Sequence, residues 1–440
     1  MCGIIISSVN IDDKGNVYKY VKNRGPDRTH EVTHKGINFV HFLLHLTGEL
    51  TVQPLIEDDI VCMFNGEIYN YKDIDSESKS DIYSIIKAYK IYGEGFIKKL
   101  DGEFVIILFD FKKNKLIISS DIFKTKPLFY KIDEDIIISS YESVCKKIKN
   151  QKYNSINPNE TIIYDLNTRK KLKTLTVNEF DLNQTKDNYD DYIKAFEKAV
   201  LKRYPEKSIP LVTLSSGLDS GAIACCLKKY NKEALYISIP TNEHRGVINN
   251  RKIILGKNHL IIDLTKSEKQ YWKQDLVDKC EKFFWDWRYH IRLNIVDNGF
   301  SLGSMLGKSK IIDISKKFNK EIRVLYSGIG ADEIMAHNSY YSCGWGNVDY
   351  FPNKLEDVYP WANFYNGSME NYLKGDEYVG GCYSYETRYP FCDKEVVQEF
   401  LWLKPELKNK YKGCNYKPAL LYYLEKEGFP YHVKKLGFNV

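Results

Sequence analysis

The segment of residues 211–227 constrains the fold of this chain more strongly than any other part of the sequence. An apolar run ends in a loop of small residues, and an apolar helical run follows from Gly221 onward. A strand, a short loop and a helix in this order bring backbone N–H groups and the positive end of a helix dipole to one point, which suits an anion such as phosphate. An ordinary capped strand-to-helix turn is the alternative interpretation. The pattern Gly-x4-Gly-Lys-Ser/Thr is absent, which excludes a Walker loop.

The surrounding segments alternate between helices and short apolar strands. Strands are expected at residues 235–239, 259–263 and 323–326. An amphipathic helix is expected before the loop strand, with its apolar stripe at Tyr189, Ile193, Phe196 and Val200. This alternation predicts a doubly wound parallel sheet.

Three motifs in this half resemble asparagine synthetases and the wider group of ATP pyrophosphatases. They are Ser215-Ser216-Gly217-Leu218-Asp219-Ser220, Ser327-Gly328-Ile329-Gly330-Ala331-Asp332-Glu333 and Tyr385-Glu386-Thr387-Arg388-Tyr389-Pro390-Phe391-Cys392-Asp393. The pyrophosphate loop of these enzymes usually reads Ser-Gly-Gly-x-Asp-Ser, so Ser216 replaces its first glycine. Ile329 stands where asparagine synthetases usually carry an acidic residue, and an isoleucine can neither bind a cation nor move a proton.

The resemblance implies that this half of the chain binds ATP and Mg²⁺. The residues implied for ATP or its pyrophosphate are Leu214, Ser215, Ser216, Gly217, Asp219, Ser220, Ser327 and Gly328. The residues implied for Mg²⁺ are Asp219, Asp332 and Glu333, since hard carboxylate oxygens suit that ion. Arg388 is a further candidate, and Lys417 approximately fits the family's late lysine that stabilises departing pyrophosphate.

The chain start, Met1-Cys2-Gly3-Ile4, can form a catalytic group. Removal of Met1 would place a thiol and an α-amine on one residue. The unperturbed pKa is about 7.7 to 8.0 for the amine and about 8.5 for the thiol, so the amine can relay the thiol proton near neutral pH. The sequence therefore allows an N-terminal nucleophile, although many cysteines are simply small buried apolar residues.

Two short motifs support the catalytic interpretation. Arg24-Gly25-Pro26-Asp27 is a tight turn whose arginine can anchor the chain start, or else an ordinary surface turn. Asn65-Gly66 supplies a side-chain amide and a backbone N–H of the kind that hold an oxyanion, or else it is a type I′ hairpin turn.

Together these residues resemble the glutaminase domain of class II glutamine amidotransferases over roughly the first third of the chain. The resemblance implies an Ntn-hydrolase αββα sandwich with Cys2 as nucleophile and Asn65 and Gly66 as the oxyanion hole. It implies that Glu67 and Asp81 hold the glutamine α-amine. The family usually has an arginine where this chain has Leu43, so glutamine binding should be weakened unless Arg28 or another cation reaches in.

The chain divides at a polar linker, residues 183–188, into expected domains at residues 1–182 and 189–440. The first is rich in short apolar runs typical of strands, at residues 4–7, 39–46, 60–64, 104–111, 115–119, 136–139 and 161–164. One clear helix begins there at Ser80 or Asp81. With 43% apolar residues, 440 residues suffice for two cores.

Composition excludes several other classes of protein. No apolar run approaches the ~18 residues of a membrane span, and no basic leader is visible, so we expect a cytoplasmic enzyme. Ten scattered cysteines without Cys-x-x-Cys pairs favour reduced thiols. A net charge of +6 spread over the chain argues against a nucleic-acid partner.

The resemblance implies a glutamine-dependent asparagine synthetase. Such an enzyme converts ATP, aspartate and glutamine to AMP, diphosphate, asparagine and glutamate through an aspartyl-adenylate, and the resemblance allows a homodimer. Three alternatives remain: a relative that amidates or cyclises another carboxylate, a degenerate nucleotide-binding relative without turnover, and an RNA-modifying ATP pyrophosphatase. The amidotransferase-like start and the dispersed charge argue against the last of these.

Overall fold

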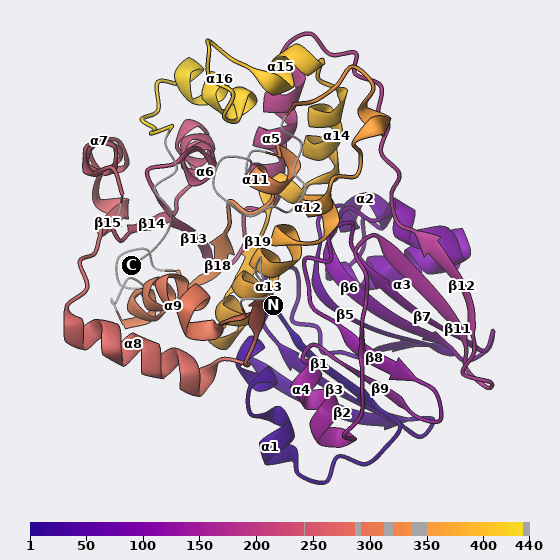
Figure 1. Cartoon of the computed structure of the whole chain (residues 1–440). Coiled ribbons are helices and arrows are strands. Elements are labelled where there is room, and N and C mark those ends of the chain that lie inside the picture. Colours follow the sequence, from indigo (N-terminus) through magenta and orange to yellow (C-terminus); the bar gives the residue numbers. More distant parts are fainter. Residues whose placement is uncertain (242, 287–291, 312–319, 337–349, 434–440) are drawn as a thin grey trace. The chain divides into compact units, whose positions relative to one another are not determined.

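The computed structural model describes the chain except for residues 242, 287–291, 312–319, 337–349 and 434–440 (Figure 1). The chain forms two compact units. The first contains Met1–Glu179, Lys279–Glu281 and Glu377–Glu386, and the second contains Phe180–Asp278, Lys282–Asp376 and Thr387–Val440. No helix among the described residues is long and apolar enough to cross a membrane. The expected domain boundaries at residues 182 and 189 remain predictions.

The first unit is built on two six-stranded sheets. One has the strand order β10-β8-β9-β1-β3-β2, with β1 (Gly3–Ser7), β2 (Arg28–His34), β3 (Ile37–Leu43), β8 (Phe129–Ile132), β9 (Ile136–Ser139) and β10 (Asn154–Ser155). The other has the order β12-β11-β7-β6-β5-β4, with β4 (Leu55–Glu57), β5 (Ile60–Ile68), β6 (Gly102–Asp110), β7 (Lys115–Ser120), β11 (Glu160–Asp165) and β12 (Lys171–Thr176). Neighbouring strands run antiparallel.

The core of this unit lies between the two sheets. Because side chains alternate along a strand, one face of each sheet can be apolar. Ile4 and Phe39 of the first sheet and Val61 and Phe109 of the second belong to one buried cluster. The helix α4 (Glu142–Ile148) packs on the first sheet and α3 (Asp81–Tyr92) on the second, while α1 (Lys14–Tyr18) packs on α4 and α2 (Tyr71–Ile74) on α3. This arrangement confirms the predicted αββα sandwich.

The second unit is built on a five-stranded sheet of order β15-β14-β13-β18-β19. Its strands are β13 (Ile209–Thr213), β14 (Leu235–Ser238), β15 (His259–Ile261), β18 (Ile322–Tyr326) and β19 (Glu386–Arg388). β13 pairs in parallel with β14 and β18, and β14 pairs in parallel with β15. The first strand therefore lies in the middle and the chain leaves it in both directions, which confirms the predicted doubly wound sheet.

Helices pack against each other and against this sheet (Figure 1). The helices are α5 (Asp190–Lys202), α6 (Leu218–Lys229), α7 (Arg245–Leu255), α8 (Lys266–Lys279), α9 (Ile295–Ile311), α11 (Ala331–Ile334), α12 (Ala362–Tyr365), α13 (Ser368–Cys382), α14 (Lys394–Trp402), α15 (Pro405–Asn409) and α16 (Pro418–Lys426). The end of α13, from residue 377 onward, belongs to the first unit. A short antiparallel pair, β16 (Phe284–Asp286) and β17 (Arg292–Asn294), completes the strands. In such a sheet, ligands bind where the chain direction reverses, beyond the carboxyl ends of the central strands.

Asn65 and Gly66 lie inside β5 and not in a hairpin turn. They pair with Val105 and Phe104 of β6. The turn interpretation of Asn-Gly is therefore wrong for this position, because the strand continues on both sides of the dipeptide. The strand expected at residues 39–46 ends at Leu43.

Candidate active sites

The chain start is held by side chains from two other elements of the first unit. The backbone N–H of Cys2 donates to Oδ1 of Asn65 at 2.7 Å. Nε of Arg24 donates to the carbonyl of Cys2 at 3.0 Å. The thiol of Cys2 lies 4.0 Å from the carbonyl oxygen of Leu44. These contacts fix the backbone of Cys2 on both sides of its side chain.

Asn65 presents an unused donor beside Cys2. Its Nδ2 is buried and has no hydrogen-bond partner among the residues that the structure describes. Leaving a buried donor unpaired costs about 1 to 3 kcal/mol, so such a group is typical of a site that receives an acceptor from outside. Gly66 adopts φ +132°, and a Cβ there would lie 1.8 Å from the carbonyl oxygen of Glu103, so only glycine fits. Asn65 thus presents one unpartnered side-chain donor among the described residues, and the role of Asn65 and Gly66 as an oxyanion hole remains a prediction.

Two buried carboxylates lie in the same region of the first unit. Glu67 accepts a hydrogen bond from Oγ1 of Thr47 at 2.7 Å. Asp81, the first residue of α3, accepts from the backbone N–H of Ile68 at 3.2 Å. Burial raises the pKa of Asp81 to about 7, and the negative charge of Glu386 acts in the same direction. Asp81 is therefore poised to change its charge near neutral pH.

The thiol of Cys2 is protonated at neutral pH while Met1 is attached. Burial raises its pKa to about 11, with the positive N-terminus opposing and the carboxylates of Glu386 and Asp81 adding to the rise. Met1 is itself buried, and its ammonium group lies 3.0 Å from Oε2 of Glu386. Removal of Met1 would supply the missing base on Cys2 itself.

The arginine that the amidotransferase resemblance leads one to expect has no direct replacement at Leu43. Leu43 is buried, and its cross-strand partner Arg28 is exposed. The fully buried Arg24 donates to Tyr141 at 3.1 Å and pairs with Glu377 at 3.1 Å, in addition to Cys2. Its guanidinium is thus held by structural partners within the first unit.

Sequence analysis assigned no role to three charged residues of this region, Lys126, Glu377 and Glu386, although Glu386 lies within one of the quoted motifs. Lys126 is buried and pairs with Glu377 at 2.8 Å. Glu377 and Glu386 bound a short segment that belongs to the first unit although it lies some 200 residues beyond the expected linker. Their contacts with Arg24, Lys126 and the chain start could not be predicted from the sequence, because the partners are distant in sequence.

In the second unit, the loop after β13 closes on itself through its hydroxyl groups. Oγ of Ser220 accepts from the N–H of Ser215 at 3.1 Å and lies 2.9 Å from its hydroxyl. The N–H of Gly217 donates to Oγ of Ser215 at 3.1 Å, and Leu214 is buried below. A Cβ on Gly328 would lie 2.9 Å from Cβ of Asp219, so the turn after β18, with Ser327 and Gly328, packs directly on this loop.

An anion already occupies part of the loop. The N–H of Ser216 donates to Oε2 of Glu243 at 2.7 Å, and the hydroxyl of Ser216 donates to the same oxygen. Two donors thus converge on one anionic oxygen, in the way that phosphate oxygens are held by loops before a helix. The carboxylate of Glu243 stands in for a phosphate oxygen, so the residues present fit a nucleotide phosphate.

A cation is likewise held beside the loop by the second unit's own residues. Nζ of the fully buried Lys417 lies 2.5 Å from Asp219 and 2.6 Å from Asp332. Burial alone would lower the pKa of Lys417, but the two carboxylates outweigh it and raise this pKa. Asp219 and Asp332 therefore point at one cation, and with phosphate oxygens and water they fit Mg²⁺.

Glu333 is held differently from the two aspartates. Its carboxylate accepts from the N–H of Gly330 at 3.0 Å and from Oγ of Ser368 at 3.3 Å, which caps the short helix α11. No group of three potential metal-binding side chains occurs among the described residues. Glu333 as a metal ligand remains a prediction.

Arg388 and Ile329 complete the set of singled-out residues. Nη1 of Arg388 donates to the carbonyl of Arg203, the C-cap of α5, at 2.6 Å. The N–H of Ile329 donates to Oγ of Ser327 at 3.3 Å, so an apolar side chain follows directly on the turn that packs against the loop. Sequence analysis missed Glu243, which lies two residues before α7, and Arg251, which lies in the middle of that helix.

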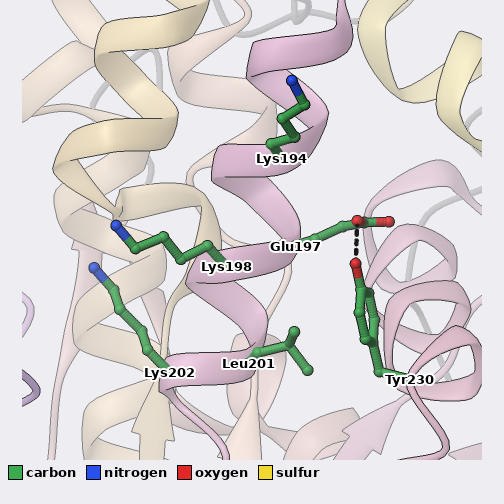
Figure 2. A pocket seen from close by; sticks show the side chains of 6 residues that line it. All are labelled: Lys194, Glu197, Lys198, Leu201, Lys202 and Tyr230. Atoms are coloured by element: carbon green, nitrogen blue, oxygen red, sulfur yellow. Dashed lines mark hydrogen bonds between the residues drawn. The ribbon is translucent and has the colours of Figure 1, made fainter.

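An open pocket of about 470 Å³ in the second unit is not part of either site (Figure 2). It is lined by Lys194, Glu197, Lys198, Leu201, Lys202 and Tyr230, which come mostly from α5. Figure 2 shows the carboxylate of Glu197 turned toward Tyr230, whose hydroxyl donates to it at 2.7 Å. Lys198 and Lys202 form ion pairs with Glu395 and Asp393 at 2.9 and 2.5 Å. These ion pairs neutralise the charge that would attract an anion.

Comparisons with known proteins match both halves of the chain. Residues 1–177 match the family described as "Glutamine amidotransferase domain", and residues 191–378 match the family described as "Asparagine synthase". A putative glutamine-hydrolysing asparagine synthetase of Methanocaldococcus jannaschii is 26% identical over 84% of this chain and 70% of its own length. Probable asparagine synthetases of Acanthamoeba polyphaga mimivirus and Schizosaccharomyces pombe are 25% and 23% identical, over 100% and 94% of this chain and 86% and 78% of their own lengths.

The sandwich with Cys2 and the doubly wound sheet with its anion loop define a glutamine amidotransferase joined to an ATP-pyrophosphatase-type domain. Within that class, the chain belongs to the family of glutamine-hydrolysing asparagine synthetases.

Lys417→Met should destabilise the second unit by roughly 3 kcal/mol, because it leaves two inward-pointing carboxylates without their cation. Added Mg²⁺ should recover part of the loss. The measurement is the thermal midpoint with and without millimolar Mg²⁺. Lys412→Met is the matched control, since Lys412 pairs with Glu425 on the surface and its loss should change little. An equal shift in both variants would contradict this account of Lys417.

Proposed function

We propose that this chain makes asparagine from aspartate, ATP and glutamine, with AMP, diphosphate and glutamate as the other products. As a member of its family, it is a ligase that forms a C–N bond with glutamine as nitrogen donor. The unpartnered Nδ2 of Asn65, on a side chain whose Oδ1 accepts from the backbone N–H of Cys2, is the observation that carries the proposal. It marks a place where an acceptor oxygen from a substrate is expected.

In the first unit, the thiolate of Cys2 attacks the carboxamide carbon of glutamine, and the α-amine of Cys2 takes the thiol proton. Nδ2 of Asn65 and the N–H of Gly66 stabilise the oxyanion. The amine then returns the proton to the leaving nitrogen, ammonia departs, and water hydrolyses the thioester to glutamate. Glu67 and Asp81 hold the substrate's α-ammonium group.

In the second unit, the acceptor carboxylate attacks the α-phosphorus of ATP, and diphosphate leaves. The loop from Ser215 to Ser220 and the turn at Ser327 and Gly328 bind the phosphates. Mg²⁺ held by Asp219 and Asp332 would neutralise their charge. Lys417, which already lies between these aspartates, is placed to balance the charge of the leaving diphosphate. Ammonia displaces AMP from the acyl-adenylate and forms the amide.

A second candidate is amidation of a carboxylate other than aspartate. Ile329 favours it, because the turn against the nucleotide loop carries an apolar side chain where the family usually has an acid. A panel of carboxylic acids, scored by pyrophosphate release, separates the two candidates. A cytoplasmic location and a homodimer remain predictions.

Cys2→Ala should abolish glutamine-dependent synthesis and spare ammonia-dependent synthesis, because it removes only the group that releases the nitrogen. AMP and amide formation with each nitrogen source are the measurements. Cys62→Ala, at a buried cysteine of β5, should retain both activities. Equal loss of both activities in Cys2→Ala would contradict a separate glutaminase site.

Glutamine binding should strengthen as pH rises through about 7. The pKa of Asp81 is raised to about 7, so its carboxylate forms only above that pH, and only the charged form pairs with the α-ammonium group of glutamine. The Michaelis constant for glutamine should fall between pH 6 and 8, and Asp81→Asn should flatten that dependence. A profile identical in the two proteins would show that another group controls binding.

A further inference from the structure

Arg251 is a buried cation of the second unit that the chemistry above does not use. It lies in α7 and is fully buried. Its Nη1 donates to the carbonyl of Ser215, its Nη2 to the carbonyl of Gly217 at 2.8 Å, and its Nε to the carbonyl of Pro430 at 2.8 Å. Burial lowers its pKa to about 9, with the charge of Glu243 opposing, so the guanidinium stays protonated at neutral pH.

The two loop carbonyls that Arg251 holds determine where the loop's N–H groups point. A peptide group is planar and trans, so its C=O and the next N–H point in opposite directions. The carbonyl of Ser215 faces Arg251, and the N–H of Ser216 in the same peptide faces the carboxylate of Glu243. One peptide group therefore accepts a hydrogen bond from Arg251 through its C=O and donates one to the carboxylate through its N–H.

The second carbonyl acts in the same way at the start of α6. With the carbonyl of Gly217 facing Arg251, the N–H of Leu218 at the first turn of that helix is turned away from the guanidinium. Free N–H groups of a first helical turn are the ones that bind anions. One guanidinium thus fixes the directions of two N–H groups of this segment, those of Ser216 and Leu218.

Gly221 makes room for this arrangement. A Cβ at Gly221 would lie 2.3 Å from Nη2 of Arg251. Glycine inside a helix costs about 1 kcal/mol relative to alanine, so its presence in α6 has a stability cost that the close approach of Arg251 explains. On the other side, Cζ of Arg251 lies 5.3 Å from the ring of Phe429.

We propose that Arg251 is a positioning residue for nucleotide binding: it holds the carbonyls of the loop so that the loop's N–H groups face the phosphates. It acts through the loop and does not touch the substrate. The inference rests on the proposed function of this loop as the ATP site.

The test compares Arg251→Lys with Arg203→Lys. Lysine keeps the charge but loses the planar fork of donors. Arg203 is a second buried arginine of the same unit, paired with Asp393 and outside the loop. With both variants folded by circular dichroism, Arg251→Lys should weaken binding of Mg²⁺–ATP about tenfold or more, measured by calorimetry, while Arg203→Lys should not change it.

Gly221→Ala gives an independent test that leaves Arg251 in the chain. The added methyl group should displace the guanidinium and weaken Mg²⁺–ATP binding by a similar factor. In a chain that also carries Arg251→Ala, adding Gly221→Ala should cause no further loss and should raise the thermal midpoint, because the clash is gone and alanine favours the helix.

The outcomes separate the inference from the function on which it rests. Wild-type affinity in both Arg251→Lys and Gly221→Ala overturns the positioning role and leaves the ATP site standing. Failure of the wild-type chain to bind Mg²⁺–ATP overturns the proposed function and the inference with it. If Arg251→Lys does not fold, the Gly221→Ala comparison decides alone.

Discussion

The buried ion pair between Arg24 and Glu377 is the interaction on which the first unit most depends. The two residues are 353 positions apart in the chain, and both are fully enclosed. The same guanidinium holds the carbonyl of Cys2, so the nucleophile's backbone is positioned by a cation that is itself fixed by a carboxylate from a distant segment. Removing one partner would leave the other charged and buried, which costs several kcal/mol. The position of Cys2 therefore depends on a segment far along the chain.

In the second unit too, charged groups are paired by other side chains of the chain. Here the partners come from the chain itself: Glu243 accepts from the N–H of Ser216, and Lys417 lies between Asp219 and Asp332. Buried donors and charges require partners in the absence of ligand, and these side chains supply them. On the proposed function, a bound nucleotide would replace these internal contacts with its own.

The sequence predicts the fold class because two hydrophobic patterns are strong. These are the short apolar runs of the first domain and the alternation of strands and helices in the second. Runs such as residues 104–111 and 136–139 become the central strands β6 and β9, and the loop after residue 213 follows β13 as expected. The edge strands β2 and β12 were missed, since their side chains are largely exposed and give no apolar signal. Lys126, Glu377 and Arg251 were missed for another reason: their partners are distant in sequence, and no local spacing encodes such contacts.

The motif residues could be placed by resemblance, but their contacts could not. Asp332 and Glu333 are adjacent in sequence, yet one pairs with Lys417 and the other caps its own helix. Asn65 and Gly66 read locally as a hairpin turn, and only the pairing of β5 with β6 rules that out.

The central claim is that nitrogen released at Cys2 enters an amide at the carboxylate that ATP activates. The most direct test incubates the enzyme with ATP, Mg²⁺, aspartate and glutamine labelled with ¹⁵N in its amide, and reads the mass of the amide product. The account predicts labelled asparagine, with one AMP formed for each molecule. AMP and glutamate produced without labelled amide would contradict it.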